Sequence, residues 1–253
     1  MSAYHERPAP ASISGSVACL WSTVATGDGL ILPDGCVDLI HLGGAGVFIA
    51  GPDTGPGAPA AGVITGVRLR TGYAGAVLGV PAHELRDRRV ALEDVWGRAG
   101  VELGARLDEE PSAVARQALL ARAVAARGAA ADPLALGAIS MLAQRPERRV
   151  AELARELAVS ERHLLRRLHV AVGYGPKTLA RILRFQRLLA LAQTGGASLA
   201  DLALDAGYFD QPHMTGEVSR LAGAPPTAVV GVAAARGEAR LVRSVQDLRA
   251  RAA

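Results

Sequence analysis

Two arginines one helical turn apart, Arg162 and Arg166, have the type and spacing that most clearly suggest chemistry in this chain. A guanidinium group donates two hydrogen bonds, which match O6 and N7 of guanine in the major groove of DNA. Further along, Gln211 has an amide that pairs with adenine, and Thr215 has the groups to contact a phosphate or a thymine methyl. These residue types predict that the chain reads base edges.

Both groups of residues lie in an internal repeat. Leu153-Ala154 aligns with Leu202-Ala203 at an offset of 49 residues, whereas Ser160 aligns with Asp210 at an offset of 50. One additional residue in the second turn explains the change. Each copy has the pattern of a helix, a tight turn, a capping Ser or Asp and a second helix closed by glycine, which is typical of a helix-turn-helix.

The second helix of each copy is predicted to present its outward face, and mainly its N-terminal part, to DNA. Leu164 and Leu168 in the first copy, and Met214 and Val218 in the second, are expected to face inward. A helical bundle with solvated arginines is the alternative interpretation. The predicted DNA-binding residues are Ser160, Glu161, Arg162, His163, Arg166, Arg167, Asp210, Gln211, His213, Thr215 and Arg220, and the same outward face is expected to hold Gly216 and Glu217.

Length and composition indicate a globular protein of two domains. The chain has 253 residues, of which 50% are hydrophobic and 4% aromatic. Its two cysteines are too few for a disulfide framework or a four-thiolate zinc site, and no cofactor is expected. Neither a signal peptide nor a membrane-spanning run is recognisable, so we expect a cytoplasmic protein with no membrane partner.

Charge is distributed unevenly between the predicted domains. Residues 1–143 carry 11 Arg against 14 acidic residues, whereas residues 144–231 carry 12 cations against 8 anions. Within the repeat, residues 145–187 have a net charge of +7 and residues 198–230 a net charge of −3. The first copy is therefore expected to dominate phosphate attraction and the salt dependence of DNA binding.

The fold class predicted from these patterns is α+β. Short apolar runs separated by Gly and Pro indicate strands of a small barrel or sandwich with flanking helices, after partly irregular residues 1–20. The predicted strands include residues 30–32, 37–40, 47–49, 62–64 and 67–70. Helices are predicted over residues 82–87, 92–96, 110–127, 134–143, 150–158, 160–170 and 177–193, with Ser198 and Asp210 capping two more.

These patterns divide the chain into four parts. They are a β-rich sensing or dimerisation domain at 1–128, a linker at 129–133, an all-α DNA-binding domain at 134–231 and a basic tail at 232–253. The long helix at 177–193 is predicted to join the two helix-turn-helix units.

Residues 140–231 resemble the AraC/XylS family of bacterial transcription regulators. Residues 173–187 (GYGPKTLARILRFQR) are similar to the family's link between its two units, residues 206–214 (AGYFDQPHM) to its second turn, and residues 223–226 (GAPP) to its closing segment. The resemblance implies a monomeric seven-helix module that lays two helices into adjacent major-groove segments of double-stranded DNA. It implies a regulator and not an enzyme, with activation and repression, and contact with RNA polymerase, left open.

Residues 30–98 also resemble an N-terminal domain found fused to this module, carried by residues 32–40, 51–54, 66–72 and 92–97. By analogy with AraC-type regulators, it would be a β-barrel that senses a small-molecule effector, mediates homodimerisation, or both. An effector-independent regulator whose N-terminal domain only dimerises is the alternative.

Candidate effector-binding residues are drawn from polar and aromatic positions of that domain. Cys36 has three interpretations, as a redox sensor, a nucleophile or a buried small hydrophobe. The aromatic residues either line a pocket or pack in the core, and Arg68 and Arg70 either bind an anionic effector or pair with Asp38. No metal site is expected, because His41 and His83 lack close pairing. The candidates are Trp21, Cys36, Asp38, Arg68, Arg70 and Tyr73.

Overall fold

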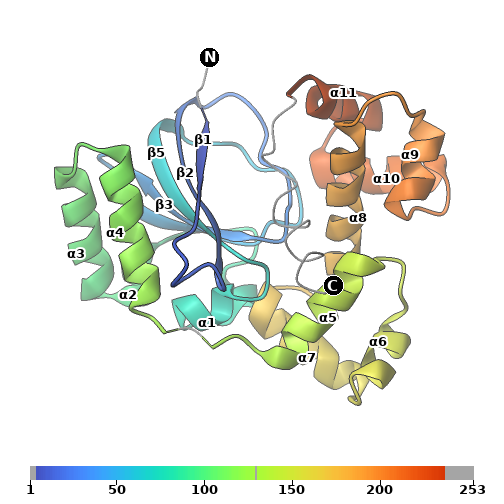
Figure 1. Cartoon of the computed structure of the whole chain (residues 1–253), viewed down its shortest axis with the longest axis horizontal. Helices are drawn as coiled ribbons and strands as arrows, with labels where there is room; N and C mark the ends of the chain where they lie inside the picture. The colour runs from blue at the N-terminus through green and yellow to red at the C-terminus, as the bar shows by residue number, and fades with distance from the viewer. Residues whose placement is uncertain (1–3, 129, 237–253) are drawn as a thin grey trace.

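The computed structural model describes residues 4–128 and 130–236. Its N-terminal part contains one antiparallel sheet of six strands in the order β1-β2-β5-β3-β4-β6 (Figure 1). This sheet and the helical C-terminal part confirm the α+β fold class. The strands are β1 (His5–Pro8), β2 (Val17–Thr26), β3 (Val37–Leu42), β4 (Gly46–Ala50), β5 (Ala61–Leu69) and β6 (Arg89–Ala91).

Alternating apolar residues give the sheet one face that packs against helices. Leu39 on β3 pairs with Ile49 on β4 and with Val67 on β5, and all three side chains are fully buried. Two antiparallel helices, α3 and α4, cover this face (Figure 1). The helices of this part are α1 (Ala74–Leu78), α2 (Leu92–Trp96), α3 (Arg98–Glu109), α4 (Ala113–Ala125) and the short 3₁₀ helix η1 (Ala82–Glu84).

Several strands differ from the sequence prediction. Residues 1–20, expected to be partly irregular, contain β1 and the start of β2. Residues 30–32 form only an isolated bridge between Ile31 and Gly57. The runs at 62–64 and 67–70 join into the single strand β5, because Gly66 continues the pairing with β2 and β3 beneath the Trp21 indole. A Cβ atom on Gly66 would lie 2.3 Å from the Trp21 ring, so only glycine leaves room for it.

The helices of the N-terminal part differ from the prediction in four places. Helix α1 was not predicted, and the helix predicted over residues 82–87 is only the 3₁₀ helix η1. The helix predicted from residue 110 begins at Ala113, because Pro111 precedes it and the Ser112 hydroxyl accepts a hydrogen bond from the Ala115 N–H. Helix α3 was not predicted, since its glycines weaken helix propensity. Gly100 is required there by packing, as a Cβ atom would lie 2.8 Å from the Glu93 backbone.

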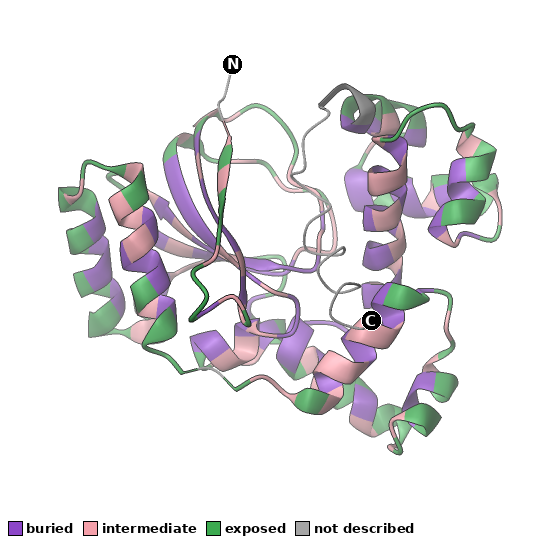
Figure 2. Cartoon of the chain, in the orientation of Figure 1, coloured by how far each residue is buried: buried purple, intermediate pink, exposed green. Residues whose placement is uncertain are grey.

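The C-terminal part is entirely helical and is organised around α8. Buried residues of α8 such as Ile182, Phe185 and Leu189 form the centre of its core, and Figure 2 shows purple along most of this helix. The predicted tail begins within α11, and residues 237–253 lie outside the described residues. The helices are α5 (Pro133–Gln144), α6 (Val150–Glu156), α7 (Glu161–Val172), α8 (Pro176–Ala192), α9 (Leu199–Ala206), α10 (Gln211–Ala222) and α11 (Pro226–Arg236).

The N-terminal and C-terminal parts contact each other through buried residues. The Gln186 side-chain amide on α8 donates a hydrogen bond of 2.7 Å to the Pro33 carbonyl. Helix α7 packs against α1 and η1, and a Cβ atom on Gly75 would lie 2.8 Å from the Val170 carbonyl oxygen. Tyr174, which follows α7, is buried beside the loop that precedes β3. The C-terminal end of α7 is therefore held by the N-terminal part.

Candidate nucleic-acid interface

The first helix-turn-helix unit consists of α6, a short turn and α7. Ala158 adopts a left-handed conformation with φ 55° in the turn, and the Ser160 hydroxyl accepts a hydrogen bond from the His163 N–H at 3.2 Å. Leu164 and Leu168 are fully buried, as predicted. Because these inward positions repeat every four residues, the opposite face of α7 points to solvent.

The exposed face of α7 carries the polar residues selected from sequence. Glu161, Arg162 and Arg166 are exposed, and His163 is half-buried. The Arg166 guanidinium lies 3.3 Å from Nδ1 of His163. Arg162 and Arg166 thus lie one turn apart on a solvent-facing helix whose first turn is capped, which is the arrangement required for guanine contacts.

Arg167 differs from Arg162 and Arg166 because it pairs with an acidic residue outside α7. Its guanidinium forms an ion pair with Asp132, and this hydrogen bond lowers the pKa of the Asp132 carboxyl. Asp132 also caps α5 by accepting a hydrogen bond from the Leu134 N–H at 3.0 Å. Arg167 therefore ties the first reading helix to the start of α5.

The second unit, formed by α9 and α10, repeats this construction. The Asp210 carboxylate accepts a hydrogen bond from the His213 N–H at 2.7 Å. At the start of α9, the Ser198 hydroxyl accepts a hydrogen bond from the Asp201 N–H at 3.2 Å and donates one of 2.6 Å to the Asp201 carboxylate, an arrangement close to the predicted capping box. Met214 and Val218 are fully buried, as predicted. The residues of α10 that lie exposed include Gln211, His213, Thr215 and Arg220.

Glu217 does not belong to the outward face on which it was expected. Its exposed fraction is 6%, and its carboxylate lies 2.9 Å from Nη2 of Arg184 and 3.2 Å from Nε of Arg181. His213 approaches the same carboxylate at 3.4 Å. The prediction failed because helical spacing cannot show that two arginines of α8 provide partners for a buried acid.

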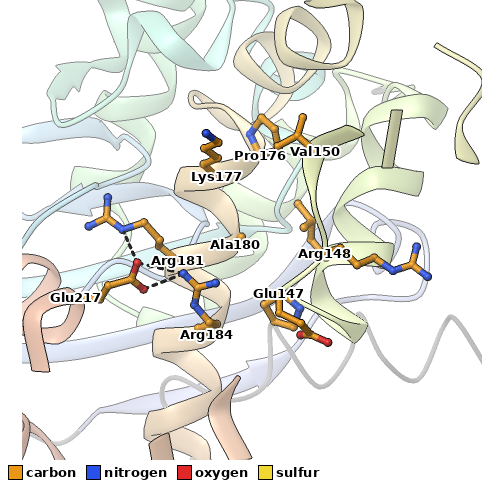
Figure 3. Close-up of a pocket in the computed structure, with 11 residues that line it drawn as sticks. Glu147, Arg148, Val150, Pro176, Lys177, Ala180, Arg181, Arg184 and Glu217 are labelled. Atoms are coloured by element: carbon orange, nitrogen blue, oxygen red, sulfur yellow. Dashed lines mark hydrogen bonds and ion pairs between the residues drawn. The ribbon is translucent and has the colours of Figure 1, made fainter. Parts of the chain in front are cut away.

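A shallow cleft of about 240 Å³ separates the two units. Figure 3 shows the Glu217 ion pairs on one side of it and Glu147 and Arg148 on the other, with Lys177 on α8 near the first turn of that helix. Lys177 is exposed, and it forms none of the ion pairs seen among the described residues. Lys177 therefore adds an exposed cationic group to this cleft.

Tyr208 helps to hold α10 on the linking helix. Its side chain is buried, and its ring lies 5.5 Å from the Arg184 guanidinium and 5.6 Å from the His213 ring, which it meets edge-on. Burial raises the pKa of the Tyr208 hydroxyl, so this group stays neutral.

Three of the candidate effector residues form one cluster on the sheet face opposite α3 and α4. The Trp21 indole donates a hydrogen bond of 2.7 Å to Asp38, and Arg68 forms an ion pair of 3.2 Å with the same carboxylate. Asp34 approaches Arg68 at 3.5 Å. Burial alone would lower the pKa of Arg68, but these two carboxylates raise it well above its ordinary value, so the guanidinium stays charged.

The other candidates lie apart from that cluster or behave as interior groups. Cys36 is buried, its sulfur lies 3.9 Å from the Thr71 hydroxyl, and burial raises the pKa of the thiol. Such a thiol is a poor nucleophile, because the thiolate is the reactive form. Arg70 donates a hydrogen bond of 2.9 Å to the Ser14 carbonyl, and Tyr73 lies half-buried just before α1.

The two histidines considered for metal binding, His41 and His83, each have a different neighbour. Nε2 of His41 is 2.8 Å from the Asp108 carboxylate, and the His83 ring lies 6.3 Å from the ring of His169 on α7. No group of three or more potential ligands occurs in residues 4–128 and 130–236. Across the same residues, no helix has both the length and the apolar character needed to cross a membrane.

The comparisons with known proteins match this architecture in two segments. Residues 153–230 match the model of a helix-turn-helix domain family. The C-terminal part of the chain is a helix-turn-helix domain of the AraC type. Residues 5–91 match a domain of unknown function (DUF6597), which therefore precedes the AraC-type domain. No curated protein matches the chain.

Solved structures with similarity to the chain include ToxT and the C-terminal domain of AraT. ToxT from Vibrio cholerae O395, bound to (E)-4-(8-methylnaphthalen-1-yl)but-3-enoic acid, has 11% identity and a TM-score of 0.45 over 92% of this chain and 98% of ToxT. The C-terminal domain of AraT, a response regulator from Geobacillus stearothermophilus, has 17% identity and a TM-score of 0.38 over 40% of this chain and 86% of that domain.

Sequence reasoning did not select four residues that form ion pairs within the C-terminal part or line its cleft. Asp132 lay in the predicted linker, and Lys177, Arg181 and Arg184 were counted only as part of a basic segment. The excess of cations over residues 145–187 was the available signal for this cleft. The sequence could not show that Lys177 stays at the surface while the arginines pair with Glu217, because this depends on tertiary contacts.

Proposed function

We propose that the protein is a sequence-specific transcription regulator that binds double-stranded promoter DNA through α7 and α10. The observation that most supports this is the pair of capped helix-turn-helix units mounted on one buried helix, α8. Each reading helix has a buried apolar face and an exposed polar face. The first places Arg162 and Arg166 outward for base contacts, and Lys177 lies between the units for phosphate contact.

A selection experiment tests this function directly. Full-length protein would be incubated with a random-sequence duplex library, and bound DNA would be enriched over several rounds. We expect one sequence class to emerge, and Arg162→Ala to weaken binding to it by about tenfold, as for loss of a bidentate guanine contact. Arg98→Ala is the matched control, because Arg98 is an exposed arginine on α3, far along the chain from the reading helices. Failure to enrich any sequence would reject the proposal.

We further propose that the N-terminal domain binds a small-molecule effector and alters DNA binding. The contact of α1 and η1 with α7 supports a direct physical route from that domain to the first reading helix. The cluster of Trp21, Asp38 and Arg68 offers polar groups for an effector on the sheet. The alternative is an effector-independent regulator whose N-terminal domain only forms a homodimer.

Thermal unfolding in the presence of metabolites separates these alternatives. A ligand at 100 times its Kd stabilises the folded protein by about 2.7 kcal/mol, so a true effector raises Tm by several degrees. Trp21→Phe, which removes the indole N–H that bonds Asp38, should reduce that shift. If no metabolite class shifts Tm, and sedimentation shows a dimer, the effector-independent alternative is favoured.

A further inference from the structure

The turn of the second helix-turn-helix unit is one residue longer than that of the first, and the structure identifies the additional residue as Phe209. In the first unit, the Val159 N–H donates a hydrogen bond of 2.9 Å to the Ala154 carbonyl. In the second, the Tyr208 N–H donates an equivalent bond of 2.9 Å to the Ala203 carbonyl. The capping residue follows directly in the first unit, whereas Phe209 intervenes in the second.

Geometry on both sides of Phe209 supports this alignment. Ala158 and Gly207, one residue before the equivalent hydrogen bonds, both have left-handed backbones with φ 55° and φ 91°. Ser160 and Asp210 each accept a hydrogen bond from the N–H three residues later. Phe209 therefore has no structural counterpart in the first unit.

Phe209 is also the most exposed of the large apolar side chains in the described part of the chain, with an exposed fraction of 85%. Its neighbour Tyr208 points inward and is 3% exposed, so the chain presents the two aromatic rings in opposite directions. The Phe209 N–H donates a hydrogen bond of 3.2 Å to Nδ1 of His213, which fixes the backbone of Phe209 against the first turn of α10. The exposed ring is thus held at the N-terminal end of the reading helix.

We propose that Phe209 determines specificity in DNA binding by contacting the C5-methyl group of a thymine beside the bases that face α10. The proposal rests on the proposed function of DNA binding. The N-terminal end of a reading helix is the part that approaches base edges, and Phe209 directly precedes that end. An apolar side chain reads the major groove through the thymine methyl, because it has no group to donate or accept a hydrogen bond.

The charges of the second unit favour this kind of contact over phosphate binding. Arg220 is the only cation in the sequence from residue 198 to residue 230. The exposed residues at the start of α10, Gln211 and His213, are polar. Asp210 caps this helix and adds a negative charge at its N-terminal end. Apolar contact area from Phe209 would supply binding where cationic groups are scarce.

The test combines a protein variant with a base that lacks only the methyl group. The probe is the duplex that full-length wild-type protein enriches from a random-sequence library, with each thymine of the enriched sequence replaced in turn by deoxyuridine. We expect Phe209→Ala to weaken binding to the parent duplex by about tenfold. For wild-type protein, one deoxyuridine substitution should cause a similar loss, and it should cause no further loss for Phe209→Ala.

Two additional variants serve as controls. Leu204→Ala removes another exposed apolar side chain from the same unit, on α9, and should leave binding within about twofold of wild type. Phe209→Leu retains an apolar group at the position and should recover part of the lost affinity. Thermal unfolding of Phe209→Ala should match wild type, because the ring is exposed.

The outcomes distinguish this inference from the function on which it rests. If wild-type protein enriches a sequence and Phe209→Ala binds it with unchanged affinity, the inference is wrong and the proposed function stands. The inference is also wrong if the loss of binding free energy from Phe209→Ala adds to the loss from every deoxyuridine substitution. A variant that binds normally but fails to activate transcription by purified RNA polymerase would assign Phe209 to a protein partner instead. If wild type enriches no sequence, the proposed function itself fails.

Discussion

The two helix-turn-helix units have the same backbone design but different groups on their reading faces. In the first, α7 exposes Arg162 and Arg166. In the second, α10 exposes mostly neutral groups, and its Glu217 turns inward to bind Arg181 and Arg184 of α8. Net charge along the sequence overstated the acidity of the second unit, because its most central acid is neutralised by cations counted for the first. The difference that remains is a scarcity of exposed cations on α10.

The units also differ in what holds them. Helix α7 packs against α1 and η1 of the N-terminal part, whereas α10 packs against α8, α9 and α11. The N-terminal part also approaches the end of α10, where a Cβ atom on Gly223 would lie 3.2 Å from the Pro56 ring. From these differences we expect the first unit to supply phosphate and guanine contacts and the second to supply more selective base contacts.

The largest expected effect concerns the ion pairs that hold the second unit. Glu217→Ala leaves Arg184 and Arg181 without their carboxylate, and loss of one partner of a buried pair costs about 3 kcal/mol of unfolding free energy. Denaturant unfolding measures this loss. Glu161→Ala, which removes an exposed acid from α7, is the control and should change stability by less than about 0.5 kcal/mol. Equal effects would show that the buried pairs do not hold α10.

The next effect compares base contacts in the two units. Arg166→Ala should weaken binding to the selected duplex by about 1–3 kcal/mol, because it removes a bidentate donor. Thr215→Ala should cost less than about 1 kcal/mol, since the Thr215 hydroxyl already donates to the Gln211 carbonyl at 2.9 Å. Titration by fluorescence anisotropy gives both values. The reverse order would contradict the division between the units.

A smaller effect is expected on the salt dependence of binding. Lys177→Ala should reduce the slope of log Kd against log salt concentration by about one unit, because it removes one phosphate contact. Arg98→Ala, at an exposed position of α3, should leave the slope unchanged. Titrations at four salt concentrations measure both slopes. An unchanged slope for Lys177→Ala would place the duplex away from the cleft.

The smallest effect concerns pH and the first unit alone. Burial lowers the pKa of His169 on α7, and the positive charge of Arg86 lowers it further. The unfolded chain, with a histidine pKa of about 6.5, then binds the proton more readily than the folded chain. The contribution of His169 to stability is therefore present above about pH 6.5 and is lost as pH falls toward the lowered folded pKa.

Substitution of His169 tests this sign. His169→Gln should lessen the fall in Tm between pH 7.5 and pH 5.5. A wild-type Tm that rises on acidification over this range, with the rise abolished in His169→Gln, would show that the protonated form is preferred in the folded protein instead.

Local sequence signals were sufficient for most of the AraC-type domain. Caps such as Ser160 and Asp210, and the inward positions Leu164 and Met214, are set by contacts within a few residues along the chain, so their spacing identifies them. The N-terminal sheet was predicted less completely. The start of β2 gains its structure from pairing with β5, whose residues lie far along the chain.

By itself, the sequence determined the two helix-turn-helix units, their caps and the exposed arginines of α7, because helix periodicity and capping are local properties. Only the tertiary structure decided which charges remain at the surface. Glu217 becomes buried because α8 supplies Arg184 beside it, and Arg167 is drawn to Asp132 across the domain. Likewise, the shift of offset in the sequence showed that the second turn has an additional residue. The tertiary structure identifies it as the exposed Phe209, because Tyr208 occupies the inward position.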